Sequence, residues 1–151
     1  MFSLFKRKPL LSHEENHKVV QAIQEAERNT SGEIRVYVES RCRFMDPLDR
    51  AKEVFTHLKM GYTKDRSGVL LYIALKDRQL AVFGDAGIHE KTGEEYWKNA
   101  VDLMIHHFNK ENYVEGICAC IKEIGDDLKD YFPYDKDTNI NELPDDIVFG
   151  R

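Results

Sequence analysis

The sequence lacks the features that mark membrane-spanning, exported and nucleic-acid-binding proteins. No stretch approaches the run of about 20 apolar residues that spans a bilayer. The amino-terminal segment has no apolar core of the kind that a signal peptide needs, since its basic residues follow only a short apolar stretch. The formal net charge of −5 argues against general binding to nucleic acid. We therefore expect a cytoplasmic protein with no transmembrane segment and no nucleic-acid partner.

Cysteine is scarce, and the chain holds only Cys42, Cys118 and Cys120. An odd number without the spacing of a disulfide framework indicates reduced thiols, as in the cytosol. Two positions along a helix turn the side chains of Cys118 and Cys120 about 200° apart, so a shared metal ion is not expected. We interpret Cys118 as a small core residue.

Signature motifs of catalysis are also absent. The chain has no GxxxxGK[ST] or GxGxxG phosphate loop, no HExxH zinc motif and no GxSxG nucleophile elbow. His13 and His17 share one face of a predicted helix, but no third ligand is implied. The adjacent His106 and His107 point about 100° apart on a helix, which does not suit one metal ion. Motifs therefore leave open whether the protein is an enzyme.

The sequence does contain hydrophobic patterns with the periods of helices and strands. Its length fits one domain. Ser12 and Glu15 form a capping box that begins a helix. Asp46 followed by Pro47 begins another. The segment 84–90 is expected to be a loop. The patterns predict helices at 13–29, 47–60, 93–108 and 113–131, and strands at 33–39, 69–75 and 79–83.

The strand predicted at 69–75 is apolar at nearly every position, so both faces of its sheet must be covered. The helix between the first two strands indicates a parallel pair with a right-handed crossover. The short turn at 76–78 indicates an antiparallel hairpin. The order α-β-α-β-β-α-α then predicts an α/β/α sandwich around a small mixed β-sheet.

Two terminal segments flank the predicted domain at 12–133. Residues 1–11 form an arm of apolar side chains and a basic triplet, either a frayed end or a weak anchor for a membrane surface or a partner. Residues 134–151 form a tail of net charge −3 with apolar residues spaced through it. We expect the tail to dock on the domain or on a partner. Its residues Ile147, Val148 and Phe149 are candidates to add a strand to a sheet edge, its own or a partner's.

Carboxylates near the predicted strand ends are the candidate metal ligands. Asp85, Glu90 and Glu94 follow the hairpin closely, and Asp65 lies in the loop before the buried strand. Carboxylate oxygens suit Ca²⁺ or Mg²⁺, and ligands of open α/β sheets gather beyond the strand ends. The alternative is that Asp85 supports a turn and Glu94 complements a helix dipole.

Three segments resemble the TPM domain family. They are Ser31-Gly32-Glu33-Ile34-Arg35-Val36, the block from Ser67 to Arg78 that reads SGVLLYIALKDR, and the turn from Val82 to Ile88 that reads VFGDAGI. The resemblance covers about residues 12–132, and this chain has one extra residue between the glycines of the turn. The segment 141–147, NELPDDI, is similar to an ending shared by a compact, soluble bacterial branch of the family.

The resemblance implies an α/β/α sandwich and leaves two functions open. A thylakoid-lumen member is described as an acid phosphatase with bound calcium, and animal members modulate a membrane receptor. The first hypothesis is therefore a Ca²⁺- or Mg²⁺-dependent, phosphatase-like hydrolase. The second, which we favour, is a module that binds a protein or the cytosolic face of a membrane protein, because a domain with no catalytic signature more often serves interaction.

Overall fold

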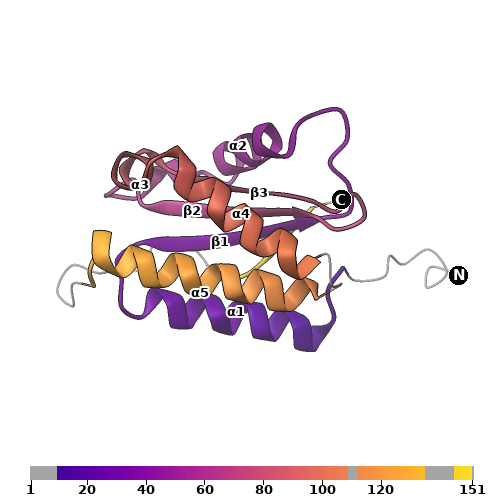
Figure 1. Ribbon diagram of the computed structural model, residues 1–151, viewed down its shortest axis with the longest axis horizontal. Helices are drawn as coiled ribbons and strands as arrows, with labels where there is room; N and C mark the ends of the chain where they lie inside the picture. The colour runs from indigo at the N-terminus through magenta and orange to yellow at the C-terminus, as the bar shows by residue number, and fades with distance from the viewer. Residues whose placement is uncertain (1–9, 109–111, 135–144, 151) are drawn as a thin grey trace, which may run out of the picture.

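A four-stranded sheet lies between helical layers in the computed structural model, which describes residues 10–108, 112–134 and 145–150. Figure 1 shows α2 on one side of the sheet and α1 and α5 on the other, with α4 crossing beside them. The helices are α1 (His13–Glu27), α2 (Pro47–His57), α3 (Ala86–Thr92), α4 (Glu94–Phe108) and α5 (Tyr113–Tyr131). The strands are β1 (Glu33–Glu39), β2 (Gly68–Ala74), β3 (Gln79–Gly84) and β4 (Val148–Phe149).

The strand order is β3-β2-β1-β4. β1 and β2 are parallel, with Ile34 opposite Val69, and β2 and β3 are antiparallel, with Leu71 opposite Val82. The predicted α/β/α sandwich, its element order and its mixed sheet are confirmed. The structure adds a short helix that the patterns did not predict, α3, and the candidate tail strand is present as β4.

The segment after β3 was expected to be a loop and instead forms α3. The Asp85 side chain accepts a hydrogen bond from the Ala86 backbone N–H at 2.7 Å, which caps the new helix. Ile88 anchors the helix in the core, and Gly93, at a φ of 81°, ends it. The helix predicted at 47–60 ends earlier, at His57, because Lys59 takes a left-handed conformation that leads into a 3₁₀ turn, η2 (Met60–Tyr62).

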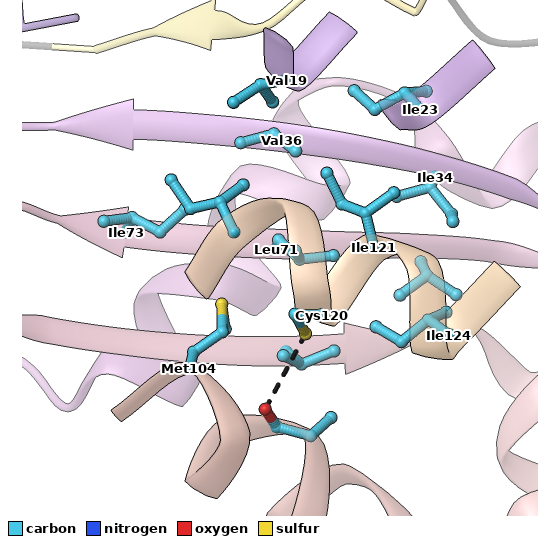
Figure 2. Packing of buried hydrophobic residues seen from close by; sticks show 14 of the residues in the cluster. Val19, Ile23, Ile34, Val36, Leu71, Ile73, Met104, Cys120, Ile121 and Ile124 are labelled. Carbon is cyan, nitrogen blue, oxygen red and sulfur yellow. Dashed lines mark hydrogen bonds between the residues drawn. The ribbon is translucent and has the colours of Figure 1, made fainter. Parts of the chain in front are cut away.

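Two hydrophobic clusters cover the two faces of β2, all of whose residues are buried. Val69, Leu71 and Ile73 face α1, α4 and α5, and the residues between them face α2. Figure 2 shows the larger cluster, where the Cys120 thiol donates to the Ala100 carbonyl at 3.7 Å. All three cysteines are free, so the expected reduced thiols agree with the structure.

One charged side chain of β1, that of Glu39, lies in the interior of the protein. Glu39, at the end of β1, is only 4% exposed and lies against α2. Arg50 of α2 donates to the Glu39 carboxylate from Nε at 2.9 Å and from Nη2 at 3.1 Å. The Tyr72 hydroxyl donates to the same carboxylate. A buried charge is tolerated here because it is paired and fully hydrogen-bonded.

The two terminal segments are only partly described. Leu10 and Leu11, at the end of the predicted arm, pack on the core, whereas residues 1–9 and 135–144 lie outside the described residues. The end of the tail forms β4, which pairs with β1 in parallel, with Val148 opposite Tyr37. None of the helices in the described ranges is long and apolar enough to cross a membrane.

A pair of carboxyl groups joins the tail to α1. Glu27, at the end of α1, accepts a hydrogen bond from the Ile34 backbone N–H at 2.8 Å and is hydrogen-bonded to Asp145 just before β4. Burial of the Glu27 carboxyl, followed by its contact with Asp145, raises the pKa of Glu27 to about 9. At neutral pH the Glu27 carboxyl therefore holds the proton that the two acids share.

We predict that the free energy of unfolding falls as the pH rises between the unfolded pKa of Glu27, 4.5, and its folded pKa of about 9. In that window the folded chain holds a proton that the unfolded chain has released. Glu27→Gln keeps both hydrogen bonds without a titrating proton, so its stability should lose this pH dependence. Chemical denaturation at several pH values measures it, with Glu25→Gln, an exposed acid on the same helix, as the control.

Candidate functional site

No strand within residues 10–108, 112–134 and 145–150 pairs with the outer edge of β3, whose residues Leu80, Val82 and Gly84 are buried. The Asp85 backbone N–H donates to the Gly68 carbonyl at 2.9 Å, which sets the phase of the antiparallel ladder. Hydrogen-bonded pairs alternate in such a ladder, so the backbone N–H and C=O groups of Leu80, Val82 and Gly84 point away from β2. Apart from the ladder, no hydrogen bond among the described residues uses these groups.

A cleft of about 860 Å³ runs along this edge, with β3 as its floor. One wall comes from α2, through Leu48 and Lys52, and the other from α4. Its size lies in the range of ligand-binding pockets, roughly 300–1,000 Å³. The residues of α4 that line it are Glu94, Trp97, Lys98, Val101 and Asp102.

The indole of Trp97 packs directly on the strand at one end of the cleft. A Cβ atom at Gly84 would lie 2.2 Å from the Trp97 ring, so only glycine admits this approach. The indole N–H of Trp97 donates to Nδ1 of His89 at 3.2 Å. Because the indole nitrogen can only donate, Nδ1 of His89 is the acceptor in this pairing.

An ion pair lies at the same end. Arg66, in a left-handed conformation, donates to the two carboxylate oxygens of Asp85 at 2.8 and 2.9 Å. Asp85 is only 3% exposed, and it also caps α3. The hydrogen bonds with Asp85 raise the pKa of Arg66. This two-pronged contact ties the loop before β2 to the start of α3.

The four predicted metal ligands occupy different surroundings. Asp85 is buried against Arg66, whereas Asp65, Glu90 and Glu94 are exposed on a loop, on α3 and on α4. Asp65 touches the start of α3 only through its backbone, since a Cβ atom at Gly87 would lie 2.1 Å from its carbonyl oxygen. Over residues 10–108, 112–134 and 145–150, no three His, Cys, Asp or Glu side chains gather around one point that would hold a metal ion. A Ca²⁺ or Mg²⁺ site at these four residues stays a prediction.

The three predicted tail residues lie at the opposite edge of the sheet from the cleft. Ile147 is buried in the core, and Val148 and Phe149 form β4 beside β1. The Gly150 backbone N–H continues the ladder by donating to the Val38 carbonyl at 2.8 Å. These residues therefore add a strand to the chain's own sheet, and their contact with a partner stays a prediction.

The cleft residues themselves were not predicted as a site. The apolar pattern of its helix places Leu48 on the buried stripe, yet Leu48 is 41% exposed and lines the cleft. Trp97 is buried in the core and also lines the opposite wall of the cleft. One signal was present in the sequence: the stretch from Leu80 to Gly84, LAVFG, belongs to the outer strand of a hairpin and has no charged residue.

Comparisons with known proteins agree with this architecture. The sequence model of the TPM domain matches residues 5–127. The chain is similar to the BA42 protein of the psychrophilic bacterium Bizionia argentinensis, whose solution structure has a TM-score of 0.87 and 39% identity, with 97% of this chain and 99% of that chain covered. None of the curated proteins matches the chain.

Two further solution structures share the fold at lower identity. One is the N-terminal domain of a protein from P. gingivalis, with a TM-score of 0.69, 21% identity, and 82% of this chain and 79% of that chain covered. The other is the N-terminal domain of cg2496 from Corynebacterium glutamicum, with a TM-score of 0.64, 13% identity, and 79% and 74% covered. Both show likeness of fold alone.

We predict that Gly84→Ala displaces the indole of Trp97 from the strand. The added methyl group meets the ring, and such overpacking costs about 1–3 kcal/mol of unfolding free energy. Trp97 is the single tryptophan, so its fluorescence emission should move to longer wavelength as the ring enters water. Gly61→Ala is the matched control, because its Cβ would meet only Phe55 at an ordinary 3.8 Å. An unchanged spectrum in Gly84→Ala would contradict the packing described.

Proposed function

We propose, starting from the fact that the chain belongs to the TPM domain family, that it is a protein-interaction module whose partner binds in the cleft along β3. The observation that carries the proposal is the cleft itself, a largely apolar channel along β3, the edge strand of the sheet in the part of the chain that the structure describes. Such a channel is a preformed place for a partner, because its walls are helices already fixed on the core.

The two cleft side chains considered for acid–base or metal chemistry, His89 and Asp85, are engaged in structural contacts. His89 accepts from the Trp97 indole at one nitrogen, and Asp85 is bound by Arg66 and caps α3. A general base needs a free lone pair directed at its substrate, and a metal ligand needs neighbours that share the ion. The arrangement favours binding over turnover.

Metal-dependent, phosphatase-like hydrolysis remains the alternative prediction. It requires Asp85 to exchange Arg66 for a cation and requires Asp65, Glu90 or Glu94 to join it. Turnover of a phosphate ester that depends on Ca²⁺ or Mg²⁺ and is lost in Asp85→Asn would support it. A more specific form of the interaction proposal is that the partner is a membrane protein and that this protein lies on the cytoplasmic side of the membrane. This form rests on the apolar and basic residues of the amino-terminal arm.

Leu48→Asp should weaken partner binding by at least about tenfold, since it places a carboxylate where an apolar contact is expected. Peptides selected from a random display library against the wild-type protein serve as probes, and the fluorescence of Trp97 in the cleft reports their affinity. The unfolding temperature should hardly change, because Leu48 is 41% exposed and lies in the first turn of α2, where an acid suits the helix dipole.

Ile105→Asp is the matched control for this test. Ile105 is also 41% exposed, but it lies on α4 beyond the residues that line the cleft. Peptide affinity should therefore survive in Ile105→Asp. Equal losses in the two variants, or a library that yields no binder of the wild type, would contradict the proposed function.

A further inference from the structure

We propose that one end of the sheet docks on an anionic lipid bilayer, with the ring of Phe44 inserted among the headgroups and basic side chains against their phosphates. This docking end is formed by residues 40–46, which follow β1, and residues 75–78, which join β2 to β3. Phe44 and Met45 are not among the residues that line the cleft. The proposal therefore concerns a second surface and goes beyond the proposed function.

The Phe44 side chain is fully exposed, at 101% of its reference area. A ring exposed to this degree contributes no burial to folding. Its backbone has a φ of 67°, in the left-handed region that is costly for a bulky residue and that glycine adopts freely. Residues held in such conformations cluster at functional sites. The fold therefore carries a strained, exposed phenylalanine that its own packing does not use.

Hydrogen bonds on both sides of Phe44 fix the loop that presents it. The Cys42 backbone N–H donates to the Asp77 carboxylate at 2.8 Å, which ties the loop to the turn at 75–78. The Cys42 thiol donates to the Met45 carbonyl at 3.3 Å, which closes the chain around Phe44. A loop that is already ordered loses less conformational entropy on binding. The ring is thus presented in a preformed position.

Basic side chains surround the exposed apolar ones at the docking end. The two loops carry two acidic residues and four exposed basic ones, which are Asp46, Asp77, Arg41, Arg43, Lys76 and Arg78. Asp77 is bound internally, by the Arg41 guanidinium at 3.2 Å and by the Cys42 amide. Cationic side chains beside an exposed aromatic ring complement anionic lipid, whose phosphates accept hydrogen bonds and whose acyl boundary accepts the ring.

The beginning of α1 lies at the same end. The Ile34 backbone N–H donates to the Glu27 carboxylate at 2.8 Å, so the end of α1 meets the start of β1 and the two elements run in opposite directions. Their lengths match, at about 22 and 23 Å from the rise per residue of each. The start of α1 therefore reaches the docking end, and Figure 1 shows it on the same side as the loop between β1 and α2.

Further apolar and basic residues adjoin this end. β4 is parallel to β1, so its last residue, Phe149, lies there and is 44% exposed. Residues 1–9, which precede the described part of α1's approach, contain three apolar side chains and a basic triplet in their sequence, which are Phe2, Leu4, Phe5, Lys6, Arg7 and Lys8. Stable attachment to a bilayer takes two signals, since one weak anchor binds only marginally. The loop at Phe44 supplies the second signal.

A bilayer is the occupant that suits this surface. Phe44 projects from a loop, and a fluid bilayer accepts a projecting ring without a preformed pocket. Several separate segments also share one end of the sheet, so a flat surface engages them together and their contributions reinforce one another. The basic side chains add attraction to an anionic surface that salt screens.

Flotation of the full-length protein with lipid vesicles tests the proposal. Vesicles of phosphatidylcholine with about one third phosphatidylserine should bind the wild type at least about tenfold more tightly than vesicles of phosphatidylcholine alone. Phe44→Asp should weaken binding to the anionic vesicles by at least about tenfold. Phe44→Gly should weaken it similarly without lowering the unfolding temperature, because glycine suits the left-handed backbone.

Tyr62→Asp is the matched control. Tyr62 is also an exposed aromatic residue, at 82%, but it precedes β2 and so lies toward the opposite end of the sheet. Vesicle binding should survive in this variant. Equal losses in Tyr62→Asp and Phe44→Asp, or binding that needs no anionic lipid, would overturn the proposal.

Two further outcomes would also overturn it. A wild type that binds neither kind of vesicle would do so, as would a Phe44→Asp variant that binds like the wild type and thereby assigns attachment to residues 1–9 alone. The display peptides of the preceding test keep the two proposals apart. Vesicle binding that fails while peptides still bind in the cleft would leave the proposed function standing, and Phe44→Asp should leave peptide affinity unchanged because Phe44 does not line the cleft.

Discussion

The burial of β2 is the constraint on which the rest of the structure depends. All of its residues are buried, and its side chains alternate between the cluster with α2 and the cluster with α1, α4 and α5. A strand that is apolar on both faces requires a helical layer on each side. Once both faces are covered, the edges of the sheet are the places where its backbone can meet another chain.

The two edges of the sheet differ in what lies beside them. The edge beside β1 is closed by β4, and the shared proton of Glu27 and Asp145 joins that segment to α1. Along the edge at β3, residues of α2 and α4 form the two walls of the cleft. The contact of Trp97 with Gly84 fixes one end of this cleft. The chain therefore fills one edge with its own residues, whereas a cleft runs along the other.

The candidate site was only partly predictable because nearness in sequence is a poor guide to nearness of side chains. Asp85, Glu90 and Glu94 lie within ten positions, yet α3 turns them apart, and Asp85 faces inward to cap that helix. The tail strand was predicted, but which edge receives it depends on the register with β1. Leu48 fits the core pattern of its helix, yet it is 41% exposed and lines the cleft, which only the position of α2 relative to β3 and α4 decides.

The sequence by itself determined the elements and their order, since each follows from a local pattern. The capping box at Ser12 and Glu15 begins α1 as predicted, and the apolar run of β2 specifies a sheet covered on both faces. Only the tertiary structure decided which edge carries the cleft, that Leu48 and Trp97 both line it, and that Glu27 keeps its proton at neutral pH. Those features arise where residues distant in the chain meet, and hydrophobic periodicity describes how each element is buried but not which elements are neighbours.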